Sequence, residues 1–221
     1  MNECSIVNVG ISQWYERGSQ RLARSLEPYV GADLLTWDEL PSGSPPHAAV
    51  PYAFKPWAML VARARGHRYV LWCDSAVWAI RSPMPIFDAI ARDGYFITEN
   101  GFRCGEWITD AALQLMGLTR DGAFEIPDYS GCCFGLDMVS DIGREFFTQY
   151  LKRAQDGSFC GDWKNDRGQC SADPRCKGHR HDQVVGSIIA HRLGMKFNRE
   201  KLFRYYVPEP EPSVCLLAQG M

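Results

Sequence analysis

The sequence predicts an α/β protein with a mainly parallel central sheet flanked by helices, and three observations support this fold class. Apolar runs of strand-forming residues alternate with segments whose apolar residues are spaced for helices. The run from Tyr69 to Cys73 has no charge and no period-two alternation, which is typical of a strand buried on both faces. The chain has 221 residues, enough for one large domain with an ample core.

The first half of the chain is expected to supply most of the sheet. A buried strand is predicted over residues 5–9, a helix over 18–26 and a second strand over 32–37. Turn residues crowd positions 41–46, which indicates a loop. A helix over 54–65 is closed by Gly66 and leads into the strand that ends before Asp74.

The second half continues the alternation and adds a polar insertion. Helices are predicted over 85–92, 109–116, 140–154 and 183–193, with strands over 95–98 and 132–136. Residues 157–181 are polar, rich in Cys and His, and show little periodicity. We expect a single domain over residues 1–204 and an extended tail over 205–221 that contains Pro-Glu-Pro-Glu-Pro.

Composition bounds the partners and the compartment. The formal net charge is −2 and the isoelectric point is about 6.2, so no overall basic bias indicates nucleic acid. No apolar run approaches the roughly 18 residues of a membrane helix, and the N-terminus lacks a signal-peptide pattern. We therefore expect a cytoplasmic protein whose nine cysteines are mostly reduced thiols.

Several common catalytic signatures are absent from the sequence. It contains no GxxxxGK[ST], no GxGxxG after a strand, no GxSxG and no HExxH. These absences exclude the commonest nucleotide hydrolases, dehydrogenases, serine hydrolases and zinc peptidases.

Asp74 is the first candidate site residue, because it follows the buried strand directly. In open α/β sheets, ligands bind outside the carboxyl ends of the strands. A carboxylate there can hold a hard divalent cation, which in turn can hold phosphate oxygens. The alternative is that Asp74 only caps a turn.

The densest polar cluster is His179-Arg180-His181-Asp182. Asp182 precedes an apolar-periodic helix, which favours an N-cap worth about 1 kcal/mol. The same helix start also favours anions, so an active-site role stays open. His179 or His181 is a candidate for ligating a metal or contacting phosphate; either is alternatively a hydrogen-bonded loop histidine.

A structural zinc competes for these histidines. Its ligands would be Cys160, Cys170, Cys176 and His179. Their spacings do not match a paired CxxC ribbon, so free thiols are the alternative.

Each of three further residues has one interpretation as a ligand contact and another that involves no ligand. Gly131 lies in a small-residue strand and permits close backbone approach to a ligand, or simply tight packing. Lys55 and Arg17 face a diphosphate or are solvated surface cations.

In order along the chain, these pieces resemble a glycosyltransferase of the GT-A fold, a Rossmann-like architecture. The matching features are the N-terminal strand, the helix that starts near Lys55, the motif Val70-Leu-Trp-Cys-Asp-Ser-Ala-Val77, the small-residue strand 130–136, and His181-Asp182-Gln183 opening a helix. The resemblance covers about residues 5–197 in architecture. The family motif is usually Asp-x-Asp, and here Ala76 takes the third position.

The resemblance implies transfer of a sugar from a nucleotide-diphosphate sugar to an acceptor hydroxyl. It implies donor contacts at Arg17, Lys55, Asp74, Ser75 and Gly131, with Asp182 beside the reacting carbon. It implies Mn²⁺ or Mg²⁺ at Asp74, with His181 or His179 completing the site, although some members of the fold work without metal.

Other functions stay open at this stage. A nucleotidyltransferase of similar architecture would cut the α-phosphate, and a zinc-stapled module would use residues 157–181 to bind nucleic acid. The acceptor is a sugar, a protein, a small metabolite or a hydroxymethylated DNA base as in phage DNA-modifying transferases. DNA binding would need a basic patch, and the residues expected to form it are Lys164, Arg167, Arg175, Lys177 and Arg180.

Overall fold

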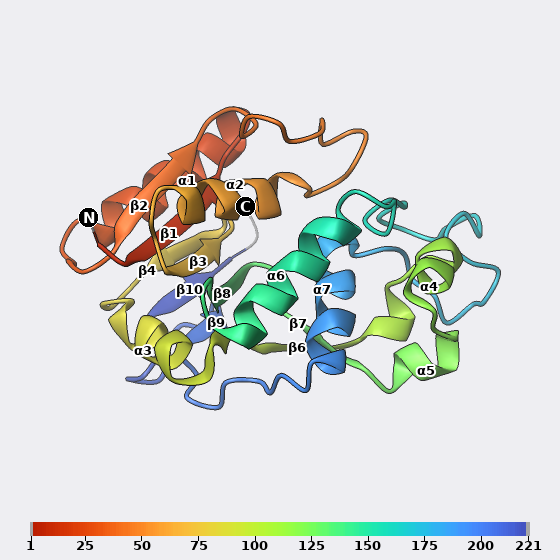
Figure 1. Ribbon diagram of the computed structural model, residues 1–221. Coiled ribbons are helices and arrows are strands. Elements are labelled where there is room, and N and C mark those ends of the chain that lie inside the picture. Colours follow the sequence, from red (N-terminus) through yellow and green to blue (C-terminus); the bar gives the residue numbers. More distant parts are fainter. Residues whose placement is uncertain (1, 220–221) are drawn as a thin grey trace.

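The computed structural model describes residues 2–219 and confirms the predicted α/β fold. A five-stranded sheet has the order β2-β1-β3-β8-β5 (Figure 1). Its strands are β1 (Cys4–Val9), β2 (Asp33–Trp37), β3 (Tyr69–Cys73), β8 (Cys133–Asp137) and β5 (Tyr95–Phe96). β1 pairs in parallel with β2 and β3, whereas β8 runs antiparallel to both of its neighbours. The sheet is therefore mainly parallel, with one reversed strand.

Helices cover both faces of this sheet. Successive residues of β1 and β3 point to opposite sides, so their apolar side chains need cover on both faces. Ile6 and Leu71 contribute to one buried cluster, and Val7 and Trp72 contribute to the other. The first cluster includes side chains of α1 (Gln13–Leu26) and α3 (Met84–Asp93). The second includes side chains of α2 (Phe54–Ala64), α6 (Asp141–Arg153) and α7 (His181–Arg192).

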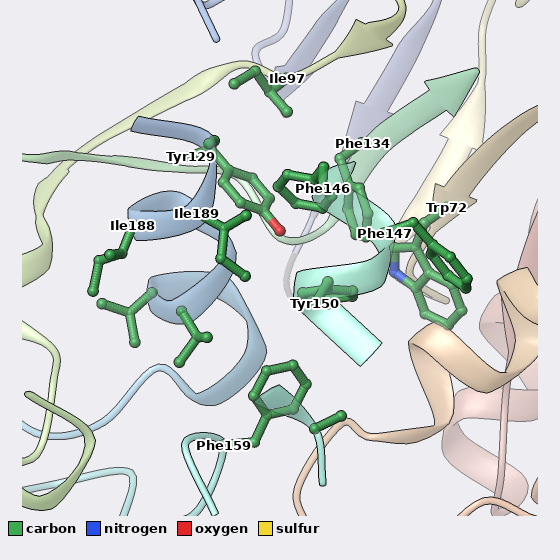
Figure 2. Packing of buried hydrophobic residues seen from close by; sticks show 14 of the residues in the cluster. Trp72, Ile97, Tyr129, Phe134, Phe146, Phe147, Tyr150, Phe159, Ile188 and Ile189 are labelled. Carbon is green, nitrogen blue, oxygen red and sulfur yellow. The ribbon is translucent and has the colours of Figure 1, made fainter. Parts of the chain in front are cut away.

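The second cluster is rich in aromatic rings (Figure 2). Tyr150 of α6 stacks on Phe146 with centroids 5.6 Å apart, and it contacts Phe134 of β8 edge-on at 5.8 Å. Ile188 and Ile189 of α7 are fully buried in the same cluster. This packing fixes α7 relative to the sheet.

Smaller elements surround the main sheet. They are the 3₁₀ turn η1 (Cys104–Glu106), the helices α4 (Asp110–Met116) and α5 (Arg120–Phe124), and the strands β4 (Val77–Ala79), β6 (Glu99–Arg103), β7 (Pro127–Tyr129), β9 (Phe203–Tyr205) and β10 (Leu216–Ala218). β6 pairs with β7, and β4, β10 and β9 form a separate sheet. None of the helices in residues 2–219 has the length and apolarity needed to span a membrane.

The predicted tail over residues 205–221 needs correction as far as the structure describes it. Leu216, Leu217 and Ala218 are buried, and β10 pairs with β4 and β9. The segment therefore belongs to the domain and holds down β4, the strand that follows Asp74.

Two other boundaries differ from the sequence prediction. α1 begins at Gln13 rather than near residue 18. Its first turn is exposed and has no apolar periodicity, so the sequence pattern did not indicate it. α7 begins at His181 rather than at Gln183, so Asp182 lies inside the helix.

Candidate active site

Asp74 and Asp182 meet at the carboxyl end of β3, and Lys55 joins them. Asp74 follows β3, Asp182 lies in the first turn of α7, and Lys55 is in the first turn of α2. Lys55 Nζ lies 3.2 Å from Asp74 Oδ1 and 3.0 Å from Asp182 Oδ2. The two carboxylates that the sequence singled out therefore share one ammonium.

Lys55 uses its hydrogen-bonding capacity within the protein. It donates a hydrogen bond to the Gly131 carbonyl at 2.9 Å and forms ion pairs with the two carboxylates, so oxygens of three protein residues surround its ammonium group. Burial lowers the pKa of Lys55, but the charges of Asp182 and Asp74 outweigh it and raise that pKa above its ordinary value. Lys55 is thus an internal counter-ion rather than the free diphosphate contact expected from the sequence.

Asp182 is fixed from two sides and does not cap its helix. Its Oδ2 also accepts a hydrogen bond from the Tyr150 hydroxyl at 3.1 Å. The N-cap position of α7 is Arg180, and no side chain makes a capping hydrogen bond there. The N-cap interpretation was wrong, because the helix starts two residues earlier than predicted and the Asp182 side chain points inward to Lys55. Burial raises the pKa of Asp182 to about 6, against the opposing charge of Lys55.

Asp74 keeps one oxygen free. Trp72 Nε1 donates to Asp74 Oδ1 at 2.7 Å, the oxygen that also faces Lys55. Within residues 2–219, Oδ2 has no hydrogen-bond partner, and the side chain is 27% exposed. Asp74 is therefore held in a fixed orientation with one oxygen available to a ligand.

A row of rings lies beside Lys55. His47, Tyr52, His181 and Trp163 follow one another with centroid separations of 4.9, 5.4 and 5.7 Å. The Tyr52 ring lies 5.1 Å from Lys55 Nζ, and its backbone has a positive φ of 60°. The loop before α2 and the polar insertion thus both contribute aromatic side chains next to the carboxylates.

The predicted divalent-cation site is not assembled by the residues present. His179 is fully buried, and its two ring nitrogens are engaged with Thr109 N and Ser158 O. Burial lowers the pKa of His179 to about 3, so it is neutral. His181 Nδ1 is engaged with Phe159 O. Within residues 2–219, no three His, Cys, Asp or Glu side chains form a group that could hold a metal.

The four expected zinc ligands do not gather either. Cys170 Sγ lies 3.1 Å from Asp162 O, Cys176 Sγ lies 3.5 Å from Ile108 O, and Cys160 Sγ lies 3.6 Å from Ala49 O. All nine cysteines are free thiols. The residues do not fit a structural zinc, so the free-thiol alternative describes this structure.

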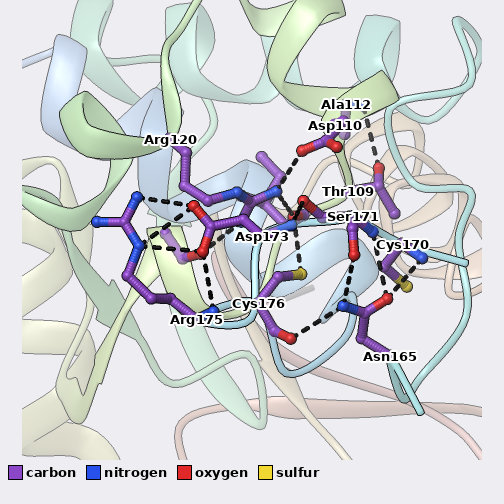
Figure 3. A network of polar contacts seen from close by, with 12 residues as sticks. Thr109, Asp110, Ala112, Arg120, Asn165, Cys170, Ser171, Asp173, Arg175 and Cys176 are labelled. Carbon is purple, nitrogen blue, oxygen red and sulfur yellow. Dashed lines mark hydrogen bonds and ion pairs between the residues drawn. The ribbon is translucent and has the colours of Figure 1, made fainter. Parts of the chain in front are cut away.

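Hydrogen bonds hold the polar insertion together instead (Figure 3). Asn165 accepts from the Cys170 backbone at 2.8 Å and donates to the Cys176 carbonyl at 3.1 Å. Arg175 pairs with Asp173 and Asp121, and Lys177 pairs with Glu106. Two members of the expected basic patch are therefore neutralised by carboxylates.

The remaining expected donor contacts are only partly at the site. Ser75 is buried, and its hydroxyl lies near Ser19 Oγ at 3.2 Å and Val9 O at 3.4 Å, so it ties β3 to β1 and α1. Gly131 touches the site through the carbonyl that receives Lys55. Arg17 is exposed on α1 and makes no ion pair within residues 2–219.

Arg180 is a cation of a different kind. Its guanidinium lies 4.1 Å from the Trp107 ring centroid, 4.5 Å from that of Trp163 and 5.6 Å from that of Phe102. Within the described residues it has no carboxylate at ion-pair distance, and its buried Nε has no hydrogen-bond partner. Aromatic faces thus hold an uncompensated positive charge two residues before Asp182.

Sequence reasoning missed Trp72, Tyr150 and Tyr52 as parts of the site. Trp72 had a usable signal, because residues two apart on a strand share a face and Trp72 therefore points with Asp74. Tyr150 looked like any apolar-face residue of its helix. Tyr52 lies in a loop without a pattern.

Comparisons with known proteins bear on the fold. No protein-family model matches the sequence, and no curated protein matches it. Among solved structures, the bifunctional glycosyltransferase WbbM superposes with a TM-score of 0.55 at 8% identity, over 97% of this chain and 45% of that chain. Mouse xyloside xylosyltransferase 1 superposes with a TM-score of 0.54 at 10% identity, over 99% of this chain and 97% of that chain. The chain thus spans less than half of WbbM, and it has a GT-A-like glycosyltransferase fold, as its sequence predicted.

Proposed function

We propose that this protein is a glycosyltransferase that moves a sugar from a nucleotide-diphosphate sugar to an acceptor hydroxyl. The observation that carries the proposal is the Lys55-bridged pair of Asp74 and Asp182 at the carboxyl end of β3. In sheets of this kind ligands bind at that edge. The GT-A-like fold supports the same reaction class.

The two carboxylates take different roles in this proposal. Asp74 offers Oδ2 to a hydroxyl of the donor, because its other oxygen is occupied by Trp72 and Lys55. Asp182, held by Lys55 and Tyr150, faces the reacting carbon and stabilises positive charge that develops there. The bond from the sugar carbon to the diphosphate oxygen breaks, and a bond to the acceptor oxygen forms. The acceptor proton leaves with the diphosphate or passes to a carboxylate.

The chain's own residues, rather than a preformed metal site, support this reaction. Of the expected Mn²⁺ or Mg²⁺ ligands, His179 has both ring nitrogens engaged, whereas Asp74 Oδ2 and His181 Nε2 have no hydrogen-bond partner among residues 2–219. A cation that accompanies the donor phosphates would meet one carboxylate here. No specific observation favours the nucleotidyltransferase or the zinc-stapled nucleic-acid module, and none supports a DNA acceptor.

Donor screening tests the proposal. A panel of nucleotide-diphosphate sugars is added to the protein, and thermal shift and release of nucleoside diphosphate are measured. We expect one donor class to raise the melting temperature and to be turned over. Asp182→Asn should lower kcat about a hundredfold or more with the fold intact.

Asp166→Asn is the matched control, because Asp166 is exposed in the polar insertion and pairs with no described residue. It should leave kcat unchanged. Full activity in both Asp74→Asn and Asp182→Asn would refute the assignment.

A further inference from the structure

A groove of about 680 Å³ lies between the β5–β6 turn and the chain that follows α7. Thr98, Glu99 and Asn100 form one wall, and residues 196–199, 201 and 203–207 form the other. In Figure 1 the second wall is the blue segment that leaves α7 and runs below β6 toward β9. The volume of the groove falls within the range of sites for small ligands, roughly 300–1,000 Å³.

The groove is basic, although the whole chain is slightly acidic. Lys196, Arg199, Lys201 and Arg204 line it, against one carboxylate, Glu99. Lys201 and Arg204 share Glu211 Oε1, at 3.0 and 3.1 Å. Within residues 2–219, Lys196 and Arg199 have no carboxylate at ion-pair distance. Two exposed cations therefore remain uncompensated, an arrangement that attracts anionic ligands.

Aromatic rings give the groove a second property. Tyr205 and Tyr206 line it and are 47% and 49% exposed, so each presents part of a ring to solvent. Exposed rings of this kind offer an apolar face and a hydroxyl together, which suits the mixed surface of a sugar. Thr98 lines the same groove and is 8% exposed, and its Oγ1 has no hydrogen-bond partner among the described residues.

One residue connects the groove to the carboxylates. The Tyr205 hydroxyl lies 3.1 Å from Ser130 Oγ and 3.6 Å from Cys132 Sγ. Between Ser130 and Cys132 is Gly131, whose carbonyl receives Lys55. The inner end of the groove is therefore one residue away from the Lys55 network.

We propose that this groove binds the acceptor, and that the acceptor is an anionic carbohydrate carrying carboxylate or phosphate groups. This inference rests on the proposed glycosyl transfer. Lys196 and Arg199 bind the anionic groups at the outer part, and the exposed tyrosine rings support a sugar. The acceptor hydroxyl then lies at the Tyr205 end, facing Asp74 and Asp182. A groove of this size takes a few sugar units, whereas a nucleic-acid duplex needs a broader surface.

Binding of defined probes tests the groove without requiring turnover. The probes are trigalacturonate, glucose 6-phosphate, neutral maltotriose and a short DNA duplex, measured by calorimetry at low and high salt. We expect an anionic sugar to bind, its affinity to fall with salt, and maltotriose to bind at least tenfold more weakly. Trigalacturonate and glucose 6-phosphate separate carboxylate from phosphate recognition.

Two double variants locate the site. Lys196→Gln with Arg199→Gln removes the uncompensated charges and should weaken binding of the anionic sugar at least tenfold. Arg63→Gln with Lys152→Gln removes the same charge from exposed helix positions elsewhere and should leave the affinity unchanged. Equal affinity for neutral and anionic sugars, binding of DNA alone, or binding indifferent to the groove variant would overturn the inference. If no nucleotide sugar is bound or consumed, the proposed function fails instead, whatever the probes show.

Discussion

Replacing Lys55 by methionine removes the ammonium and keeps an unbranched apolar side chain. The Lys55 and Asp182 side chains are 3% and 4% exposed, so their 3.0 Å ion pair is shielded from water. Removing one partner of a buried pair costs about 3–5 kcal/mol, because the other charge stays buried. We expect Lys55→Met to lower the free energy of unfolding by about that amount near pH 7.

The loss should depend on pH through Asp182. Burial raises the pKa of Asp182 to about 6, and Lys55 opposes that rise, so removing Lys55 raises the pKa further. A carboxyl whose folded pKa exceeds its unfolded pKa contributes stability at low pH that is lost as pH rises through the folded pKa. The deficit of Lys55→Met relative to the wild type should therefore be small at pH 5 and large at pH 8.

Urea unfolding followed by circular dichroism at pH 5 and pH 8 measures this deficit. Lys152→Met on α6 is the control, because Lys152 is exposed and makes no ion pair with a described residue. Adding Asp182→Asn to Lys55→Met should recover part of the stability, since the stranded charge is gone. A loss below about 1 kcal/mol that is equal at both pH values would refute the counter-ion role of Lys55.

Three further outcomes follow from the same geometry. Arg180→Lys should weaken donor or acceptor binding while stability changes little, because lysine keeps the charge but stacks poorly on Trp107 and Trp163; unchanged Kd values for both ligands would contradict this. EDTA should leave the melting temperature unchanged and metal analysis should find no stoichiometric zinc, because the insertion is held by hydrogen bonds around Asn165; a chelator-induced drop would restore the zinc hypothesis. Mn²⁺ alone should not bind the wild type measurably by calorimetry, whereas Ala76→Asp supplies a second carboxylate next to Asp74 and should bind it more tightly; equal Mn²⁺ affinity would show that position 76 does not face the site.

The sequence was sufficient for features that depend on local pattern. The uncharged run before Asp74 predicted a buried strand, and β3 spans the same residues, Tyr69–Cys73. The apolar stripes of α2 and α6 predicted helices whose observed bounds differ by a residue or so. These features follow from side-chain periodicity, which the sequence alone contains.

Features that depend on distant partners were not predictable in this way. The N-cap interpretation of Asp182 rested on the neighbouring residues alone, whereas Lys55 and Tyr150 hold its side chain in the structure. Histidine and cysteine spacing suggested metal sites in residues 157–181, and only the folded structure shows that carbonyls occupy those side chains. β9 and β10 are three residues each and form by pairing with each other and with β4, so no local period marks them.

The charge balance of the site connects these observations. Two carboxylates share one ammonium, which leaves one net negative charge where a diphosphate would arrive. Lys55 does not relieve that repulsion, because its single charge is already shared by the two carboxylates and its side chain is 3% exposed. Ala76 lacks the second carboxylate with which the Asp-x-Asp motif would hold a divalent cation. Arg180 precedes Asp182 by two residues and has no ion-pair partner among the described residues. Its guanidinium packs on the rings of Trp107 and Trp163. Under the proposed function, we therefore expect loss of Arg180 to weaken donor binding more than removal of divalent ions does.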